Sequence, residues 1–171
     1  MWKNQAPLLD NVGKADVMWV GLSAKLVKPA NENRPLGQDT NSGKLVHQIE
    51  QMCPEHSFYR TNLVKCAPLS QSGKLRYPGR QEMDACVNNL KLELGLVRPK
   101  IVFLLGGQVA SFLLGAKSSK LPADYSFTKR DFDGHIVVPV HHPSFILIYR
   151  RKQLHDYVAS VVQLITGERA S

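Results

Sequence analysis

Four short apolar runs divide the chain, and each is followed by glycine, proline or polar residues. The clearest run ends abruptly at Gly106 and Gly107. Runs of this length and composition are typical of buried strands. Pro139 favours an edge position for the last of them, because proline cannot donate a ladder hydrogen bond. The pattern therefore predicts strands at residues 16–20, 58–64, 100–105 and 135–140.

The segments between these runs have apolar residues three and four positions apart, which is the period of an amphipathic helix. Ser42 is the expected N-cap of the first helix, and Gly115 is the expected end of the third. Residues 117–134 are expected to form a long loop, with or without an extra hairpin. The predicted helices cover residues 42–52, 81–94, 108–114 and 151–165.

Strands that alternate with helices favour a parallel sheet covered on both faces. We therefore expect an α/β fold: a three-layer α/β/α sandwich with a central four-stranded parallel sheet. The 171 residues suit one domain, predicted to span 1–171. In such a sheet, ligands bind beyond the carboxyl ends of the strands. This places around one crevice the segments 21–25, 65–68, 106–107 and 141–144.

The distribution of charge adds a candidate partner. The chain has 22 Lys+Arg against 14 Asp+Glu, a formal net charge of +8, and neither 56–81 nor 134–155 contains an acidic residue. On charge alone, a solvated basic face explains these stretches as well as a polyanion-binding surface does. Each stretch includes a segment expected at the crevice, however, and this coincidence favours a nucleic-acid site there.

Composition narrows the class of protein further. Hydrophobic residues at 43% and charged residues at 21% are typical of a folded globular chain. No apolar run approaches the roughly 20 residues of a membrane helix, and none follows Lys3 as in a secretory signal. Cys53, Cys66 and Cys86 are too widely spaced for a disulfide framework or a zinc finger. We expect a reduced, cytoplasmic, monomeric protein with no membrane partner and no metal.

The clearest candidate for chemistry is the segment from His141 to Ser144. A histidine at the end of a buried strand, followed by proline and serine, is held at the sheet edge for catalysis or for structure. Residues 145–149 are large and mostly apolar, and Arg150 and Arg151 follow them. They suit either the start of a core-facing helix or an apolar wedge in a loop. Such a wedge, flanked by phosphate-binding cations, unstacks duplex steps.

These residues resemble a known family. The string His142-Pro-Ser-Phe-Ile-Leu-Ile-Tyr-Arg150 is similar to the second signature of the uracil-DNA glycosylase superfamily. Segments 61–68, 76–86 and 105–115 resemble, in order and spacing, further segments of the family-four bacterial and archaeal enzymes. The resemblance runs from about residue 17 to residue 165. It implies a monofunctional N-glycosylase that excises uracil, or another deaminated base, from DNA in base-excision repair.

The first motif departs from the family-four pattern. Where those enzymes have Gly-Glu-Ala-Pro-Gly, this chain reads Gly21-Leu-Ser-Ala-Lys25, so Leu22 replaces the acidic residue. The related family-five pattern also has leucine there and places a candidate catalytic Asp downstream, which makes Asp39 the candidate here. Leu36 stands where a phenylalanine usually stacks on uracil. By resemblance, Gly21, Leu22, Ser23 and Leu36 are expected at the base.

Cysteines mark a second departure. The iron–sulfur branch of the family uses four cysteines, and two of these positions match Cys66 and Cys86. The N-terminal Cys-x-x-Cys pair is absent from residues 1–13. Because a thiolate-bound cluster normally needs four protein ligands, we predict no cluster and no other cofactor.

The resemblance implies a base-flipping mechanism, since a glycosidic bond is inaccessible within the base stack. His142 is expected to stabilise negative charge on the O2 of the leaving uracil, and Asn62 to read its O4 and N3–H edge. Asp39 is the candidate for positioning the attacking water. The residues expected to contact DNA are Ser144, Ile146 or Leu147 as the wedge, and Arg150, Arg151, Lys74 and Arg76 on phosphates.

Two other functions stay open at the level of sequence. Leu22 and Leu36 also suit a DNA-binding relative with weak or lost catalysis. A nucleotide-binding α/β module that shares only the fold is the third possibility.

Overall fold

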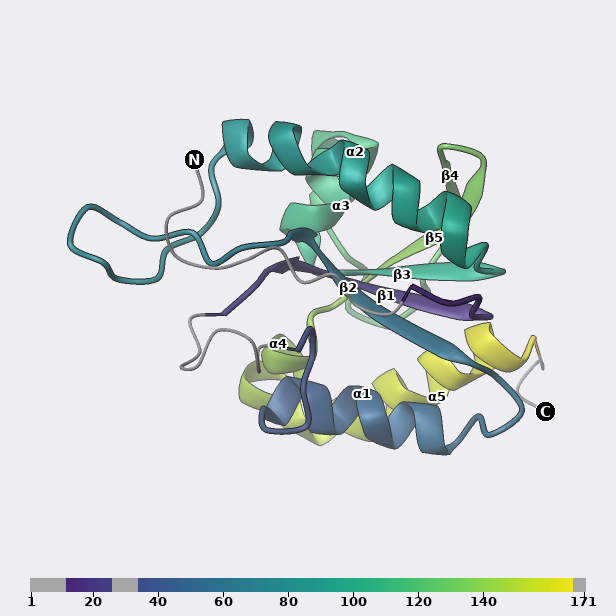
Figure 1. Cartoon of the computed structure of the whole chain (residues 1–171). Coiled ribbons are helices and arrows are strands. Elements are labelled where there is room, and N and C mark those ends of the chain that lie inside the picture. Colours follow the sequence, from purple (N-terminus) through teal and green to yellow (C-terminus); the bar gives the residue numbers. More distant parts are fainter. Residues whose placement is uncertain (1–11, 26–33, 168–171) are drawn as a thin grey trace.

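A parallel sheet forms the centre of the computed structural model, which describes residues 12–25 and 34–167 (Figure 1). The strands are β1 (Val17–Ser23), β2 (Phe58–Val64), β3 (Ile101–Leu105), β4 (Arg130–Phe132) and β5 (His135–Val140). The α-helices are α1 (Asn41–Gln51), α2 (Arg80–Val97), α3 (Gly107–Leu114), α4 (Pro143–Tyr149) and α5 (Leu154–Thr166). Two short 3-10 helices are η2 (Ala116–Ser119) and η3 (Arg151–Gln153).

Within the described residues, the strands form one sheet in the order β2-β1-β3-β5-β4. The first four are parallel, as predicted, and β4 pairs antiparallel with β5. The predicted count of four strands was therefore one short. The extra strand has three residues with no buried side chain, so it carries no apolar run. Asp133 and Gly134, both at positive φ, make the tight turn of this hairpin.

Helices cover both faces of the sheet, as the predicted three-layer sandwich requires. Figure 1 shows α1, α4 and α5 on one side and α2 and α3 on the other. Neighbouring side chains of β1 point to opposite faces of the sheet and pack against different helical layers. Trp19 packs in the cluster on the α1 side, where its ring stacks on Phe103 with 4.7 Å between centroids, and Met18 packs on the α2 side.

The largest local difference from the sequence prediction is α4. Residues 145–149 were predicted as a loop, with a core-facing helix as the alternative, and the structure shows the helix. Pro143 occupies its first turn, where a missing N–H costs nothing. The helix is short, so its period was hard to recognise in a run of consecutive apolar residues.

Smaller differences concern helix ends. Thr40, and not Ser42, caps α1: the Thr40 hydroxyl accepts a 2.9 Å hydrogen bond from the Gly43 amide. Helix α2 continues to Val97, three residues beyond the prediction. Pro139 lies in β5 beyond the three residues that pair with β4. A proline is therefore compatible with this strand, although β5 lies inside the sheet. Among residues 12–25 and 34–167, no helix has the length and apolar character needed to span a bilayer.

Candidate active site

The carboxyl ends of the parallel strands surround one cavity of about 720 Å³. Three of the four segments predicted to surround a crevice contribute to its lining, and residues 65–68 do not. Its lining comes from β1, β2, the β3–α3 turn, the segment before α2, and α4. The lining residues are Gly21, Leu22, Ser23, Asn62, Leu75, Arg76, Tyr77, Leu105, Gly106, Gly107, Gln108, His142, Ser144, Phe145, Ile148 and Tyr149.

His142 lies between β5 and α4 and is itself the N-cap of α4. Its Nδ1 accepts a 3.2 Å hydrogen bond from the Ser144 amide and lies 2.8 Å from the Ser144 hydroxyl. An amide N–H only donates, so Nδ1 carries no proton in this arrangement. The neutral ring therefore has its proton on Nε2. That N–H is a hydrogen-bond donor held in place from the other side of the ring.

The surroundings of His142 keep the ring neutral. Burial is the main cause that lowers its pKa below the ordinary value of 6.5, and the positive charge of Lys25 lowers it further. The hydrogen bonds at Nδ1 act in the same direction, because a protonated Nδ1 has no lone pair to accept the Ser144 amide. At neutral pH, His142 is thus a fixed, uncharged donor.

Asn62 is buried near the end of β2 and lines the same cavity. It pairs across the sheet with Gly21, where any Cβ would overlap the Asn62 side-chain oxygen. Glycine at position 21 therefore leaves room for this amide. No described residue forms a hydrogen bond with the Asn62 side chain, so its donor and acceptor both stay available to a ligand in the cavity.

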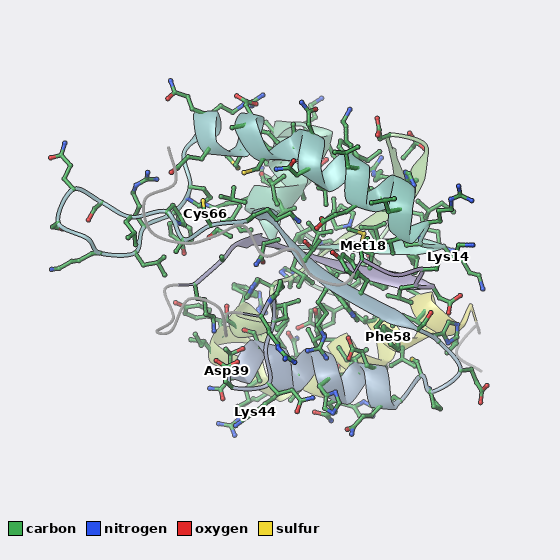
Figure 2. The ribbon with its side chains drawn as sticks, viewed as in Figure 1. Lys14, Met18, Asp39, Lys44, Phe58 and Cys66 are labelled. Atoms are coloured by element: carbon green, nitrogen blue, oxygen red, sulfur yellow. The ribbon has the colours of Figure 1, made fainter. Side chains whose placement is uncertain are left out.

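Asp39 and Leu36 lie elsewhere. Asp39 is exposed in the turn before α1, where Figure 2 labels it, and it does not line the cavity. Leu36 packs against the core on the α1 side, and its carbonyl accepts a 2.8 Å hydrogen bond from Arg60. Leu36 therefore does not line this cavity, and its place beside the base stays a prediction. The aromatic residues that do line the cavity are Tyr77, Phe145 and Tyr149, and Phe145 is stacked on His141 with 5.0 Å between ring centroids.

The predicted wedge is also corrected. Ile146 is 0% exposed, because α4 turns this side chain into the core between the sheet and α5. Leu147 is partly buried against the same cluster. The exposed apolar residues of α4 are instead Ile148 and Tyr149. Residue burial on a seven-residue helix depends on its packing, which the sequence alone did not reveal.

Ser144 has a different role from the DNA contact predicted for it. Since Nδ1 of His142 lacks a proton, the Ser144 hydroxyl must donate its hydrogen to that atom. A phosphate oxygen accepts hydrogen bonds but cannot donate one, so this hydroxyl has no hydrogen left for it. Ser144 holds the imidazole.

The basic residues predicted to hold phosphates divide into two groups. Arg150 and Arg151 are exposed and make no ion pair with any described residue, and the same holds for Lys74. Arg76 lines the cavity, but its guanidinium is bidentate to Glu82, at 2.7 and 2.8 Å. This contact lowers the pKa of Glu82 and neutralises Arg76 locally.

A buried ion pair lies behind Asn62, and sequence analysis missed it. Lys65 contacts the carboxylate of Glu93 on α2, which also accepts hydrogen bonds from Thr61 (3.0 Å) and Tyr59 (3.1 Å). All four residues are buried. The network ties the end of β2, and with it Asn62, to α2. The only sequence signal was a Glu at an otherwise apolar position of the helix.

The cysteines do not fit an iron–sulfur cluster. Cys66 and Cys86 are neighbours in the core on the α2 side, where Figure 2 labels Cys66, whereas Cys53 lies in the core on the opposite side of the sheet. Burial, then the adjacent Cys86 and Glu82, raise the pKa of Cys66 to about 11, so its thiol is protonated at neutral pH. Two neighbouring thiols, one of them this reluctant to ionise, fall short of a four-thiolate site.

Comparisons with known proteins agree on one family. The family model described as "Uracil DNA glycosylase superfamily" matches residues 6–166. A Type-4 uracil-DNA glycosylase from Thermotoga maritima is 27% identical over an alignment of 111 residues, and the match covers 61% of this chain and 53% of that protein. The chain thus spans about half the length of this relative.

A solved structure shares the fold. The crystal structure of wild-type Pedobacter heparinus SMUG2 matches 90% of this chain and 76% of that chain, with a TM-score of 0.61 and 14% identity. The family model covers nearly the whole chain, including every strand and helix around the cavity. The chain therefore belongs to the uracil DNA glycosylase superfamily.

Proposed function

We propose that this chain hydrolyses the N-glycosidic bond of uracil, or of another deaminated base, in DNA after flipping the nucleotide into the 720 Å³ cavity. One observation carries the proposal: His142, with its proton on Nε2, lines the same cavity as the unengaged amide of Asn62. The Nε2–H of His142 can stabilise a developing anion, and the amide of Asn62 can form hydrogen bonds with the polar edge of a pyrimidine.

Base recognition rests on Asn62. Its side-chain NH₂ donates to an acceptor such as O4 of uracil, while its carbonyl oxygen accepts from N3–H. Cytosine has a donor at position 4 and an unprotonated N3, so the same amide would have to turn over to pair with it. Gly21, with no side chain, leaves the amide space to take up its orientation. Phe145 and Leu22 supply apolar walls.

Catalysis rests on His142. As the glycosidic bond breaks, the bonding electrons move onto uracil and negative charge grows on O2. The Nε2–H of a neutral imidazole, already oriented by Ser144, stabilises that charge without reorganisation. A water molecule then adds to the sugar carbon and gives up a proton, and a proton from solvent neutralises the uracil anion, so that the products are an abasic site and free base.

A second candidate function is a DNA-binding member of the superfamily with weak or lost catalysis. The observation that favours it is the lining of the cavity, which among the described residues contains no carboxylate. Leu22 stands at the position of the family-four acid, and Asp39 is exposed outside the cavity. Without a carboxylate to position water, excision depends on electrostatic stabilisation by His142 alone.

An excision assay tests the proposal. Oligonucleotides with one uracil, single-stranded or opposite guanine or adenine, are incubated with protein in excess, and alkali-labile sites are counted. We expect excision by the wild type and a loss of about 10²-fold to 10³-fold in His142→Ala, the usual cost of removing one oxyanion-stabilising donor. His155→Ala, which removes an exposed histidine on α5, is the matched control and should excise at the wild-type rate.

The outcomes separate the two candidates. No excision at enzyme excess, with DNA binding intact, contradicts the glycosylase and supports the binding protein. Excision that survives His142→Ala with an unchanged circular dichroism spectrum contradicts the assigned role of His142.

A further inference from the structure

Large exposed apolar side chains gather at the mouth of the cavity. Leu75 and Tyr77 lie on the segment between β2 and α2, and Ile148 and Tyr149 lie at the end of α4. The two tyrosines are 74% and 71% exposed, respectively. A soluble protein that places several such side chains around one opening has an interaction site there.

Contacts hold the two tyrosine-bearing segments in place. On α4, the ring of Tyr149 lies 5.5 Å from that of Phe145, which in turn stacks on His141. On the other segment, Arg76 donates to the carbonyl of Tyr77 at 2.9 Å and to the carbonyl of Leu69 at 3.1 Å. The β2–α2 segment also projects beyond the sheet edge in Figure 1. The rim therefore exists before a ligand binds.

Positive charge lies just outside this apolar rim. Arg150 and Arg151 directly follow Tyr149, and Lys74 precedes Leu75. None of these three side chains forms an ion pair with a residue in the described part of the chain. Aromatic faces next to a cavity, with cations beyond them, match the chemistry of a nucleic-acid strand, whose bases stack and whose phosphates are anionic.

We infer that Tyr77 and Tyr149 stack on the bases either side of the flipped nucleotide, and that the strand so held is single-stranded DNA. The inference rests on the proposed function for the identity of the nucleic acid as DNA. Each tyrosine offers one face to one unpaired base, on opposite segments of the rim. Of the two residues predicted to fill the gap in a duplex, Ile146 is wholly buried and Leu147 is partly buried against the core. A strand whose bases are already unpaired can stack on the two exposed tyrosines without such a wedge, and it is the favoured substrate.

Equilibrium binding tests this inference without requiring turnover. The full chain is titrated into a fluorescein-labelled, uracil-free single strand and into the matching duplex, and anisotropy is recorded over a range of salt concentrations. We expect the single strand to bind more tightly than the duplex. Tyr77→Ala and Tyr149→Ala should each weaken single-strand binding by about five-fold to 150-fold, the range known for loss of one base–aromatic stack.

Three controls make the result specific. Tyr77→Phe and Tyr149→Phe keep the ring and should bind within about two-fold of wild type. Leu92→Ala removes an apolar side chain of similar exposure from α2, far along the chain from the rim, and should have no effect. The slope of log affinity against log salt should stay the same in the tyrosine variants, since no cation is removed.

Two results would overturn the inference: alanine variants that bind the single strand as tightly as Leu92→Ala does, or a wild type that binds the duplex at least as tightly as the single strand. The excision assay is independent of this measurement. Tyrosine-dependent binding without excision would refute the glycosylase and leave the rim, whereas excision without tyrosine-dependent binding would refute the rim alone.

Discussion

The two basic stretches of the chain differ in what faces their side chains. In residues 56–81, four of the five cations meet a carboxylate: Arg60 pairs with Glu50, Lys65 with Glu93, Arg76 with Glu82 and Arg80 with Asp84. In residues 134–155, Arg150 and Arg151 project from the end of α4 with no such partner among the described residues. Among the described residues, the first stretch therefore keeps Lys74 without a carboxylate partner, whereas the second keeps both Arg150 and Arg151.

The difference comes from the helices that flank each stretch. Glu50 lies on α1, and Glu82, Asp84 and Glu93 lie on α2, so both helices bring acids to β2 and the segment after it. In the part of the chain that the structure describes, no helix brings a carboxylate into an ion pair with Arg150 or Arg151. An acid-free stretch of sequence is therefore evidence for a polyanion site only after the neighbouring elements are known. The surface that can attract a polyanion is centred on α4, beside His142.

The largest expected effect is on the free energy of unfolding, and it comes from breaking the buried Lys65–Glu93 ion pair. Glu93→Gln removes the carboxylate that Lys65 contacts in its buried site, and we expect a loss of about 3–5 kcal/mol in the free energy of unfolding, measured by urea denaturation. Asp84→Asn breaks the exposed Arg80–Asp84 pair and should cost about 0.5 kcal/mol or less.

A double replacement controls for a general destabilising effect of substituting these buried residues. Lys65→Met combined with Glu93→Leu removes both buried charges and should recover most of the stability lost in Glu93→Gln. Equal losses in Glu93→Gln and Asp84→Asn would contradict this prediction, because they would show that burial of the Lys65–Glu93 pair has no energetic consequence.

The second effect concerns DNA binding. Arg150→Gln with Arg151→Gln removes two unpaired cations, so the slope of log affinity against log salt for a single strand should fall by about 1.4, at about 0.7 per lost phosphate contact. Arg80→Gln, in the neutralised stretch, should leave the slope unchanged. Similar slopes for the two variants would contradict the comparison, because they would make both stretches equal partners in binding.

The smallest effect is on the titration of His142. Its pKa lies below 6.5, because burial and the charge of Lys25 disfavour the imidazolium. As the pH falls from about 6.5 towards this lowered pKa, the unfolded chain takes up a proton that the folded chain does not, so stability is lost in that interval. Lys25→Gln should raise the midpoint towards 6.5 in an NMR titration of the ring C–H signals. A midpoint unmoved by this change would exclude Lys25 as a cause.

Strands were predictable because their signal is strong and local. The runs at β2 and β5 have the predicted bounds, and those at β1 and β3 are shifted by one to three residues. The sequence signals for β4 and α4 were weaker than those for the other strands. β4 has no apolar pattern, and α4 is a run of apolar residues whose period cannot be read over two turns. Their structure depends on pairing with β5 and packing against the core.

The candidate site likewise includes some residues that could be predicted from the sequence and others that could not. His142 and Asn62 were identified from sequence, by resemblance, and the topology places both on the cavity. Tyr149 was included only within the predicted wedge of residues 145–149, and Tyr77 was missed, because a sequence does not show which side chains are exposed at a cavity rim. Leu36 and Ile146 were assigned to base or DNA by resemblance to the family, whereas tertiary packing turns both side chains towards the core.

By itself, the sequence determined the alternation of strands and helices, the parallel sheet and the histidine and asparagine at its carboxyl edge. These depend on local periodicity and on rules of connection that hold for any such chain. Only the tertiary structure decided which cations are neutralised, which apolar residues of α4 reach solvent and which nitrogen of His142 carries the proton. Each of these depends on contacts between residues distant in sequence or on the direction of a side chain. Local sequence patterns determine neither the contacts nor the direction.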